Sequence, residues 1–230
     1  MTAPRVLDLF SCAGGAAMGY HRAGFAVDGC DIAERPRYPF PYHRGDALEY
    51  LDRLITTGAI ERYALVHASP PCQAKNTLTV GTNASQGWGG THEDLVAPTR
   101  ELLDRSGLPY VIEQPNGKAE IRKDVTLCGE MFALAVLRHR NFELGRWAVA
   151  RPAHPKHRGY VRGWRHGVYR DGPYVAAYGE GGGKASVAEM QHAMGITWTD
   201  IHEELTEAIP PAYTGWIGTA FLTCRQEVFA

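Results

Sequence analysis

The first half of the chain alternates strand-length apolar runs with segments that can be helical, and this alternation limits the fold more than any other feature. The apolar runs occupy residues 6–10, 26–31, 63–67 and 110–113. The helix-compatible segments between them occupy residues 16–23, 47–57 and 94–105. Such alternation is typical of a mostly parallel sheet with helices on both faces. We therefore predict an α/β fold in which ligands bind beyond the carboxyl ends of the strands.

The size and composition of the chain support one large domain of this kind. Its 230 residues are 44% hydrophobic and 21% charged, which is ordinary for a globular protein. The five cysteines are an odd number without close CxxC spacing, so they suggest neither a disulfide framework nor a zinc ribbon, and we predict no metal. We find neither a secretory signal nor an apolar run of about 18 residues, so we expect a cytoplasmic protein without a membrane partner.

Residues that could bind a ligand follow the early strand-like runs. Gly14 and Gly15 form a tight turn before a helix, where backbone can approach a ligand closely, although the spacing is not GxGxxG. A purely structural turn is the alternative. Asp31 ends the second run, where nucleoside-binding sheets place a carboxylate on ribose hydroxyls. Asp46 could contact an adenine amino group or cap the helix that follows it.

A cysteine, Cys72, follows two prolines just after the third apolar run. Because the prolines end the strand, the thiol stands on a rigid turn at the mouth of the sheet, where it can attack a ligand. Glu113 ends the next predicted strand and would face Cys72 across a cleft. The alternatives are a cysteine that only packs and an exposed acid at a strand end.

Charge is distributed unevenly along the chain. Residues 138–170 contain nine Lys or Arg and one acid, Glu143, which gives +8; since the whole chain carries −1, the remainder carries −9. Histidine, tryptophan and tyrosine are interleaved with the basic residues. This mixture suits phosphate contacts and base stacking, and the alternative is a solvated basic face.

Five motifs resemble, in order and spacing, those of the DNA (cytosine-5)-methyltransferase family. They are Phe-Ser-Cys-Ala-Gly-Gly at 10–15, Ser-Pro-Pro-Cys-Gln at 69–73, Ile-Glu-Gln-Pro at 112–115, Arg-His-Arg at 138–140 and Ala-Ile-Pro-Pro at 208–211. The Met-Gly-Ile and Ile-Pro-Pro-Ala-Tyr tail looks like the compact phage or prophage members. The resemblance spans Val6 to Gly218. It implies a Rossmann-like S-adenosylmethionine-dependent methyltransferase fold with a very small target-recognition insertion.

The resemblance implies transfer of the methyl group of S-adenosylmethionine to carbon 5 of a flipped-out cytosine in DNA, with S-adenosylhomocysteine as the second product. Cys72 would add covalently to carbon 6 of the base. Glu113 would hold ring nitrogen 3 and the exocyclic amine. Arg140, with Arg138, would hold the base carbonyl and the adjacent phosphate.

The resemblance also implies further binding residues and a division of the chain. The cofactor would contact Phe10, Cys12, Gly14, Gly15, Asp31, Ile32, Asp46, Ala47, Pro70 and Glu207. DNA would contact Ser69, Gln73, Arg146, Arg151, Arg158 and Arg162. The catalytic core would cover residues 1–143, a short basic target-recognition region 144–175, and a segment that completes the core 176–230. So short a recognition region predicts a short or relaxed recognition sequence in the DNA. We expect a monomer. We also expect it to act in a bacterial or phage-infected cell, as enzymes of restriction and modification do.

Two departures from the family pattern keep other functions open. Gln114-Pro115 replaces the usual Asn-Val after the glutamate, and Thr206-Glu207 replaces Gly-Asn in the tail. A relative that transfers a modified group, or that only binds DNA or cofactor, is one alternative. Amino methylation is another, because Ser-Pro-Pro also opens the motif of those enzymes, although Cys72 stands where they need an aromatic residue.

Overall fold

The computed structural model describes residues 2–71, 94–117, 120–165, 167–178 and 185–228. Its centre is a seven-stranded sheet in the order β3-β2-β1-β4-β5-β7-β6. The strands are β1 (Arg5–Leu9), β2 (Ala26–Asp31), β3 (Tyr42–Arg44), β4 (Leu65–Ala68), β5 (Tyr110–Pro115), β6 (Val125–Leu127) and β7 (Arg140–Gly145). β1 to β5 are parallel, and β7 runs antiparallel between β5 and β6. The predicted α/β fold with a mostly parallel sheet is confirmed.

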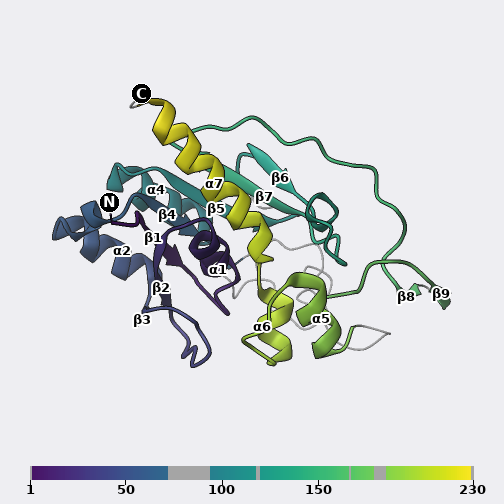
Figure 1. Cartoon of the computed structure of the whole chain (residues 1–230). Coiled ribbons are helices and arrows are strands. Elements are labelled where there is room, and N and C mark those ends of the chain that lie inside the picture. Colours follow the sequence, from purple (N-terminus) through teal and green to yellow (C-terminus); the bar gives the residue numbers. More distant parts are fainter. Residues whose placement is uncertain (1, 72–93, 118–119, 166, 179–184, 229–230) are drawn as a thin grey trace.

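Helices cover both faces of this sheet (Figure 1). One face carries α1 (Gly15–Arg22) and α7 (Pro211–Val228), and the other carries α2 (Ala47–Thr56) and α4 (Val96–Ser106). In β1, Val6 packs with the residues of α1 and α7, whereas Leu7 packs with those of α2 and α4. Both side chains are fully buried, because the side chains of a strand alternate between two faces and both faces are covered here.

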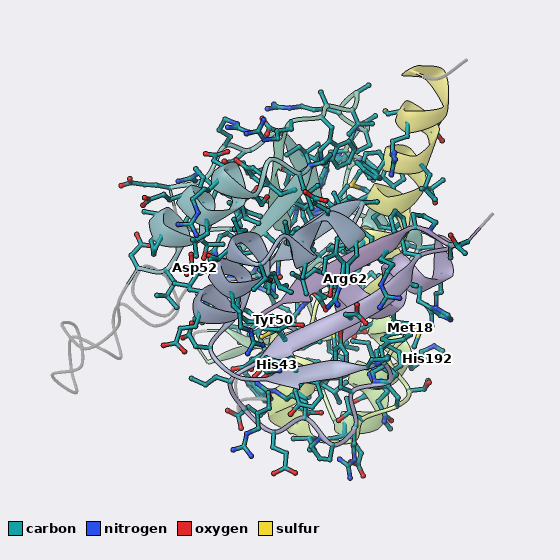
Figure 2. All side chains as sticks on the ribbon, turned by 90° about the vertical axis from the view of Figure 1, so that its left-hand side faces the viewer. Met18, His43, Tyr50, Asp52, Arg62 and His192 are labelled. Carbon is teal, nitrogen blue, oxygen red and sulfur yellow. The ribbon has the colours of Figure 1, made fainter. Side chains whose placement is uncertain are left out.

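β3 and α2 meet near the edge of the sheet, where the side chains of His43 and Tyr50 lie side by side (Figure 2). Their ring centroids are 4.2 Å apart and the rings are inclined by 16°. α2 begins after Asp46, whose Oδ1 accepts hydrogen bonds from the backbone N–H groups of Leu48 at 2.8 Å and Glu49 at 3.0 Å. Of the two roles left open for Asp46, helix capping is the one that the structure shows.

A third, smaller core lies under α5 (Val187–Met194) and α6 (His202–Glu207), beside the layered sheet (Figure 1). α5 begins with a capping box, in which Ser186 accepts from the backbone of Glu189 and Glu189 reaches back to Ser186. The indole Nε1 of Trp198 donates to the carbonyl of Ala13 at 2.7 Å. This small core therefore packs on the turn between β1 and α1.

β5 is two residues longer than predicted. Gln114 and Pro115 pair with Asn141 and Arg140 of β7. This pairing extends β5 to Pro115, whereas we expected the proline to end the strand before it. A proline is tolerated at a strand end, where one missing N–H costs little. β7 itself crosses the predicted boundary between positions 143 and 144. Two short 3-10 helices, η1 (Ala59–Arg62) and η2 (Gly129–Phe132), complete the connections around the sheet.

The connection that follows β7 is long and extended (Figure 1). Residues 147–160 contain no helix or strand. The chain then forms a hairpin of β8 (Gly163–Arg165) and β9 (Val168–Arg170), which is separate from the central sheet. Both features lie in the region predicted to recognise the target. Within the described part of the chain, no helix combines the length and apolar character needed to cross a membrane.

Candidate functional site

Parallel strands end side by side at one edge of the sheet, and most of the predicted site residues follow them. Phe10 to Gly15 follow β1, Asp31 ends β2, Ser69 follows β4, and Glu113 lies near the end of β5. This is the edge at which open α/β sheets bind their ligands. Cys72 and Gln73 lie outside the described residues, so the geometry of the site comes from their neighbours.

Glu113 is the buried acid at this edge. Its Oε1 lies 2.8 Å from Nε of Arg140, and the side chain of Glu113 is 6% exposed. The antiparallel register of β5 and β7 brings the two residues together. Burial raises the pKa of Glu113 above its ordinary value, although Arg140, Arg138 and a hydrogen bond with Ser69 act in the opposite direction. The neutral carboxyl, which can donate a hydrogen bond, is therefore available over a wider pH range than usual.

Gln114 fastens the turn that leads to Cys72. Its Nε2 donates to the carbonyl oxygen of Pro70 at 2.6 Å, and Gln114 is buried. Gln114 directly follows Glu113 in β5, so this hydrogen bond links the turn to the strand that carries the buried acid. The glutamine that departs from the family pattern thus has a structural use here, since its side chain spans from β5 to the Pro70 carbonyl.

A buried histidine absent from the sequence-based prediction supports Ser69. The Nδ1 of His67 lies 3.0 Å from the Tyr20 hydroxyl, and its Nε2 lies 2.9 Å from Oγ of Ser69. Burial lowers the pKa of His67 to about 3, so the ring is neutral. Ser69 also hydrogen-bonds Glu113, so a polar chain runs from α1 to the buried acid. The sequence feature that could have indicated this role is the position of His67 inside an otherwise apolar strand.

Arg138 has different partners from those predicted. Its guanidinium donates to three backbone carbonyls, those of Ala177 at 2.6 Å, Thr206 at 2.6 Å and Ala208 at 2.8 Å. Burial lowers its pKa to about 9, and the charge of Arg140 contributes to the shift. These three hydrogen bonds join the residues before β7 to the tail of the chain. The structure thus gives Arg138 a structural role, and its predicted contact with the base or phosphate stays a prediction.

The turn between β1 and α1 is packed so tightly that its glycines are required by the protein itself. Gly14 has a φ of +79°, and a Cβ at Gly15 would lie 2.1 Å from the carbonyl oxygen of Ile209. The backbone N–H of Cys12 donates to Oδ2 of Asp31 at 2.8 Å, which ties the turn to β2. The structural explanation of the glycines thus holds, and their predicted contact with the cofactor stays a prediction.

Apolar side chains flank Asp31. Ile32 is 72% exposed, whereas Asp31 is buried and Phe10 is half-buried with a φ of +57°. An exposed isoleucine beside a buried acid offers a face that a flat heterocycle could cover. Ala47 and Pro70, the other predicted apolar contacts, are both buried.

Glu207 places a carboxylate beside the same turn. The Sγ of Cys12 lies 3.6 Å from Oε2 of Glu207, at the end of α6. Burial raises the pKa of Glu207, while the contact with Cys12 and the charge of Arg35 lower it. The second departure from the family pattern therefore lies next to the turn predicted to hold the methionine part of the cofactor.

The four arginines predicted to contact DNA all have partners within the protein. Arg146, Arg151, Arg158 and Arg162 bond, respectively, to the backbone of Asp104, the backbone of Asp124, the carboxylate of Glu130 and the carboxylate of Glu189. These donors anchor the extended segment to the rest of the fold. Their predicted contacts with DNA stay a prediction, since each guanidinium has further N–H donors besides those used in these contacts.

Other basic and aromatic side chains remain exposed around the hairpin. Lys156, Tyr160 and Arg170 are exposed and line an open groove of about 790 Å³. The guanidinium of Arg170 lies 5.1 Å from the centre of the Tyr160 ring. In the hairpin, Trp164 is 57% exposed and Tyr169 is 49% exposed. Charge and exposed aromatic rings therefore gather on this surface.

Comparison with known proteins supports the fold. No protein-family model matches the sequence, and no curated protein matches it. Among solved structures, a triple mutant of DNMT2 from Spodoptera frugiperda is similar with a TM-score of 0.64 and 12% identity, over 96% of this chain and 100% of that chain. The methyltransferase EhMeth of Entamoeba histolytica gives 0.53 and 9%, over 98% and 99%. The chain thus has the Rossmann-like fold of S-adenosylmethionine-dependent methyltransferases.

Proposed function

We propose that this protein transfers the methyl group of S-adenosylmethionine to carbon 5 of cytosine in DNA. The observation that carries the proposal is the buried Glu113, paired with Arg140 at 2.8 Å, next to a Gln114 side chain that holds the turn before Cys72. In this arrangement a buried acid and the turn that precedes Cys72 lie at the ligand-binding edge of a methyltransferase fold. The fold shared with DNMT2 and EhMeth is consistent with this chemistry.

The proposed reaction needs a nucleophile, a hydrogen-bond donor and a base. The Cys72 thiolate forms a bond to carbon 6, while the neutral carboxyl of Glu113 donates to ring nitrogen 3 and stabilises the charge that develops there. Carbon 5 then takes the methyl group, and its proton leaves to water as the bond between sulfur and carbon 6 breaks. Arg140 fixes the orientation of Glu113 through the 2.8 Å contact between its Nε and Oε1 of the carboxyl group. The cofactor supplies the electrophilic methyl group.

The residues at the ends of β1 and β2 fit such a cofactor. Ile32 offers an exposed apolar face, and Asp31 beside it offers a carboxylate where a ribose would lie. The turn at Gly14 and Gly15 opens helix α1, whose first N–H groups attract negative charge. Glu207, on the other side of the turn, would accept from the amino group of the methionine part.

Methyl transfer is measured with the full-length protein, methyl-labelled S-adenosylmethionine, and DNA or RNA of the same sequence. Mass spectrometry of the released nucleosides then identifies the product. We expect 5-methylcytosine in DNA. A methylated amino group, or a larger group on the base, would overturn the proposal, and 5-methylcytosine in RNA alone would overturn its substrate class. A protein that binds both ligands without turnover would support a binding module instead.

A Glu113→Gln variant is expected to lose methyl transfer by about 100-fold, because removing one stabilising donor typically has an effect of that size. The wild-type rate should also fall as the pH rises through the raised pKa of Glu113, since deprotonation removes the donated hydrogen. The variant should lack this decline. Single-turnover rates across pH, with the exposed Glu61→Gln as the control, provide the measurement. A variant with the wild-type rate and profile would remove Glu113 from the mechanism.

The exposed basic surface makes a separate prediction about DNA affinity. Neutralising Lys156 or Arg170 with glutamine is expected to reduce the slope of log affinity against log salt by about one unit each. Arg22→Gln, on the exposed side of α1, is the matched control and should leave the slope unchanged. Fluorescence anisotropy of labelled DNA at several salt concentrations measures the slopes. Equal slopes in all variants would mean that this surface is only a solvated basic face.

A further inference from the structure

Four side chains that could bind a metal converge where the extended segment after β7 returns to the sheet. They are Cys128, His139, His154 and His157, and one ligand atom from each lies within 4.8 Å of all the others. The Sγ of Cys128 lies 3.5 Å from Nε2 of His157, and the Nε2 atoms of His139 and His154 are 3.1 Å apart. Cys128 is buried, whereas the histidines are half-buried or exposed, so a cation could enter from solvent.

The separations of 3.5 Å and 3.1 Å are close to those between ligand atoms of a tetrahedral metal site. With bonds of about 2.3 Å to sulfur and about 2.0 Å to nitrogen, the edges of a tetrahedron measure about 3.3 to 3.6 Å. The three imidazole rings are also close together, with centroids 5.1 to 5.2 Å apart in every pair. Hydrogen bonds can join these groups two at a time. A cation at the centre satisfies all four ligand atoms together.

We propose that Cys128, His139, His154 and His157 bind one zinc ion. A thiolate with three imidazoles is a donor set that suits zinc in tetrahedral geometry. Four protein ligands fill the coordination sphere, so the site is structural rather than catalytic. On binding, the Cys128 thiol exchanges its proton for the metal, and the proton passes to solvent. The proposal revises the sequence-based prediction of no metal.

The positions of the four ligands in the fold indicate that the site would stabilise the segment after β7. His154 and His157 belong to the stretch without helix or strand, whereas Cys128 precedes η2 and His139 precedes β7. A metal would therefore fasten a long irregular segment to the sheet, in addition to the contacts that its arginines make. His139 directly precedes Arg140, so the same metal would steady the residue that pairs with Glu113.

An ion pair beside the cluster reinforces this link. Arg158, next to His157, pairs at 2.6 Å with Glu130, two positions after Cys128, and the Glu130 side chain is only 8% exposed. The metal ligands and this ion pair thus join the same two segments. Ligands spread across 29 positions, with a single cysteine, carry no compact spacing that a sequence motif would detect.

The test measures metal content and coordination rather than methyl transfer. Full-length protein purified without a metal-affinity tag is expected to contain about one zinc per chain by plasma mass spectrometry. After chelation, titration with Co²⁺ should produce thiolate-to-metal charge-transfer absorption and the visible bands of a tetrahedral ion, saturating at about one equivalent. Cys128→Ser should abolish the thiolate band, and His157→Asn should reduce the zinc content to below about a tenth of an equivalent.

Matched variants keep the result interpretable. Cys224→Ser and His192→Asn alter the same residue types outside the cluster, and both should retain the metal; His192 lies on α5 (Figure 2). Wild-type protein that lacks zinc and gives no thiolate absorption with Co²⁺ would overturn the proposal, and this outcome does not depend on the folding of any variant. Another metal at full occupancy would overturn the assignment to zinc. A Cys128→Ser variant with unchanged cobalt bands would overturn the ligand set.

Discussion

Replacing Cys72 with serine is expected to abolish both methyl transfer and the covalent complex with DNA that contains 5-fluorocytosine. Fluorine at carbon 5 cannot leave as a proton does, so the adduct at carbon 6 persists after methyl transfer and can be seen on a denaturing gel. A serine hydroxyl is far less ionised than a thiol and forms no such adduct. The gel is run with S-adenosylmethionine present and absent, because a stable adduct requires the methyl group.

Cys224→Ser is the control, since it removes a thiol from α7 rather than from the predicted site. It should trap DNA as the wild type does. Methyl transfer that survives in Cys72→Ser would exclude the covalent mechanism. Trapping that is lost in both variants would instead indicate a general effect of cysteine replacement.

Arg138→Met is expected to lower the free energy of unfolding by about 3 to 5 kcal/mol. The change removes three charge-assisted hydrogen bonds and leaves the carbonyls of Ala177, Thr206 and Ala208 without their donor. Methionine keeps most of the side-chain volume, so the loss reports on the hydrogen bonds rather than on a cavity. The midpoint of urea unfolding should fall by roughly 1 to 2 M.

Arg22→Met is the control for this experiment, because Arg22 is exposed at the end of α1 and its replacement should leave the midpoint nearly unchanged. An Arg138→Met variant as stable as the wild type, but inactive on DNA, would restore the sequence-based role of Arg138 at the base or phosphate. Loss of stability with a proportionate loss of folded, active protein supports the structural role.

Local patterns predicted the fold because each one depends on few residues. The strand-like run at 26–31 became β2 with the same bounds, and Ser186 caps α5 through Glu189 as its spacing indicated. The glycine turn after β1 also followed from local sequence. β1 and β2 are parallel neighbours, as expected for two strands joined by a helix such as α1.

The contacts that could not be predicted are those between distant segments. Arg138 belongs to a motif of basic residues, and only the folded tail shows that its donors meet carbonyls 39 to 70 positions away. The arginines after β7 are basic in sequence, yet each of them also contacts an acid or a carbonyl of another element. The metal cluster depends in the same way on four residues whose common point exists only after folding. The charge and spacing of residues along the sequence do not indicate which distant residues they will contact in the folded protein.

The close packing of Gly15 against Ile209 has a consequence for biosynthesis. The turn predicted to bind the cofactor packs against the carbonyl of Ile209, just before the C-terminal helix, and the guanidinium of Arg138 binds the carbonyls of Thr206 and Ala208. The ribosome releases those residues after the whole central sheet, whose last strand in the chain ends at Gly145. We therefore expect this turn to reach its final shape only once the tail of the chain packs against it.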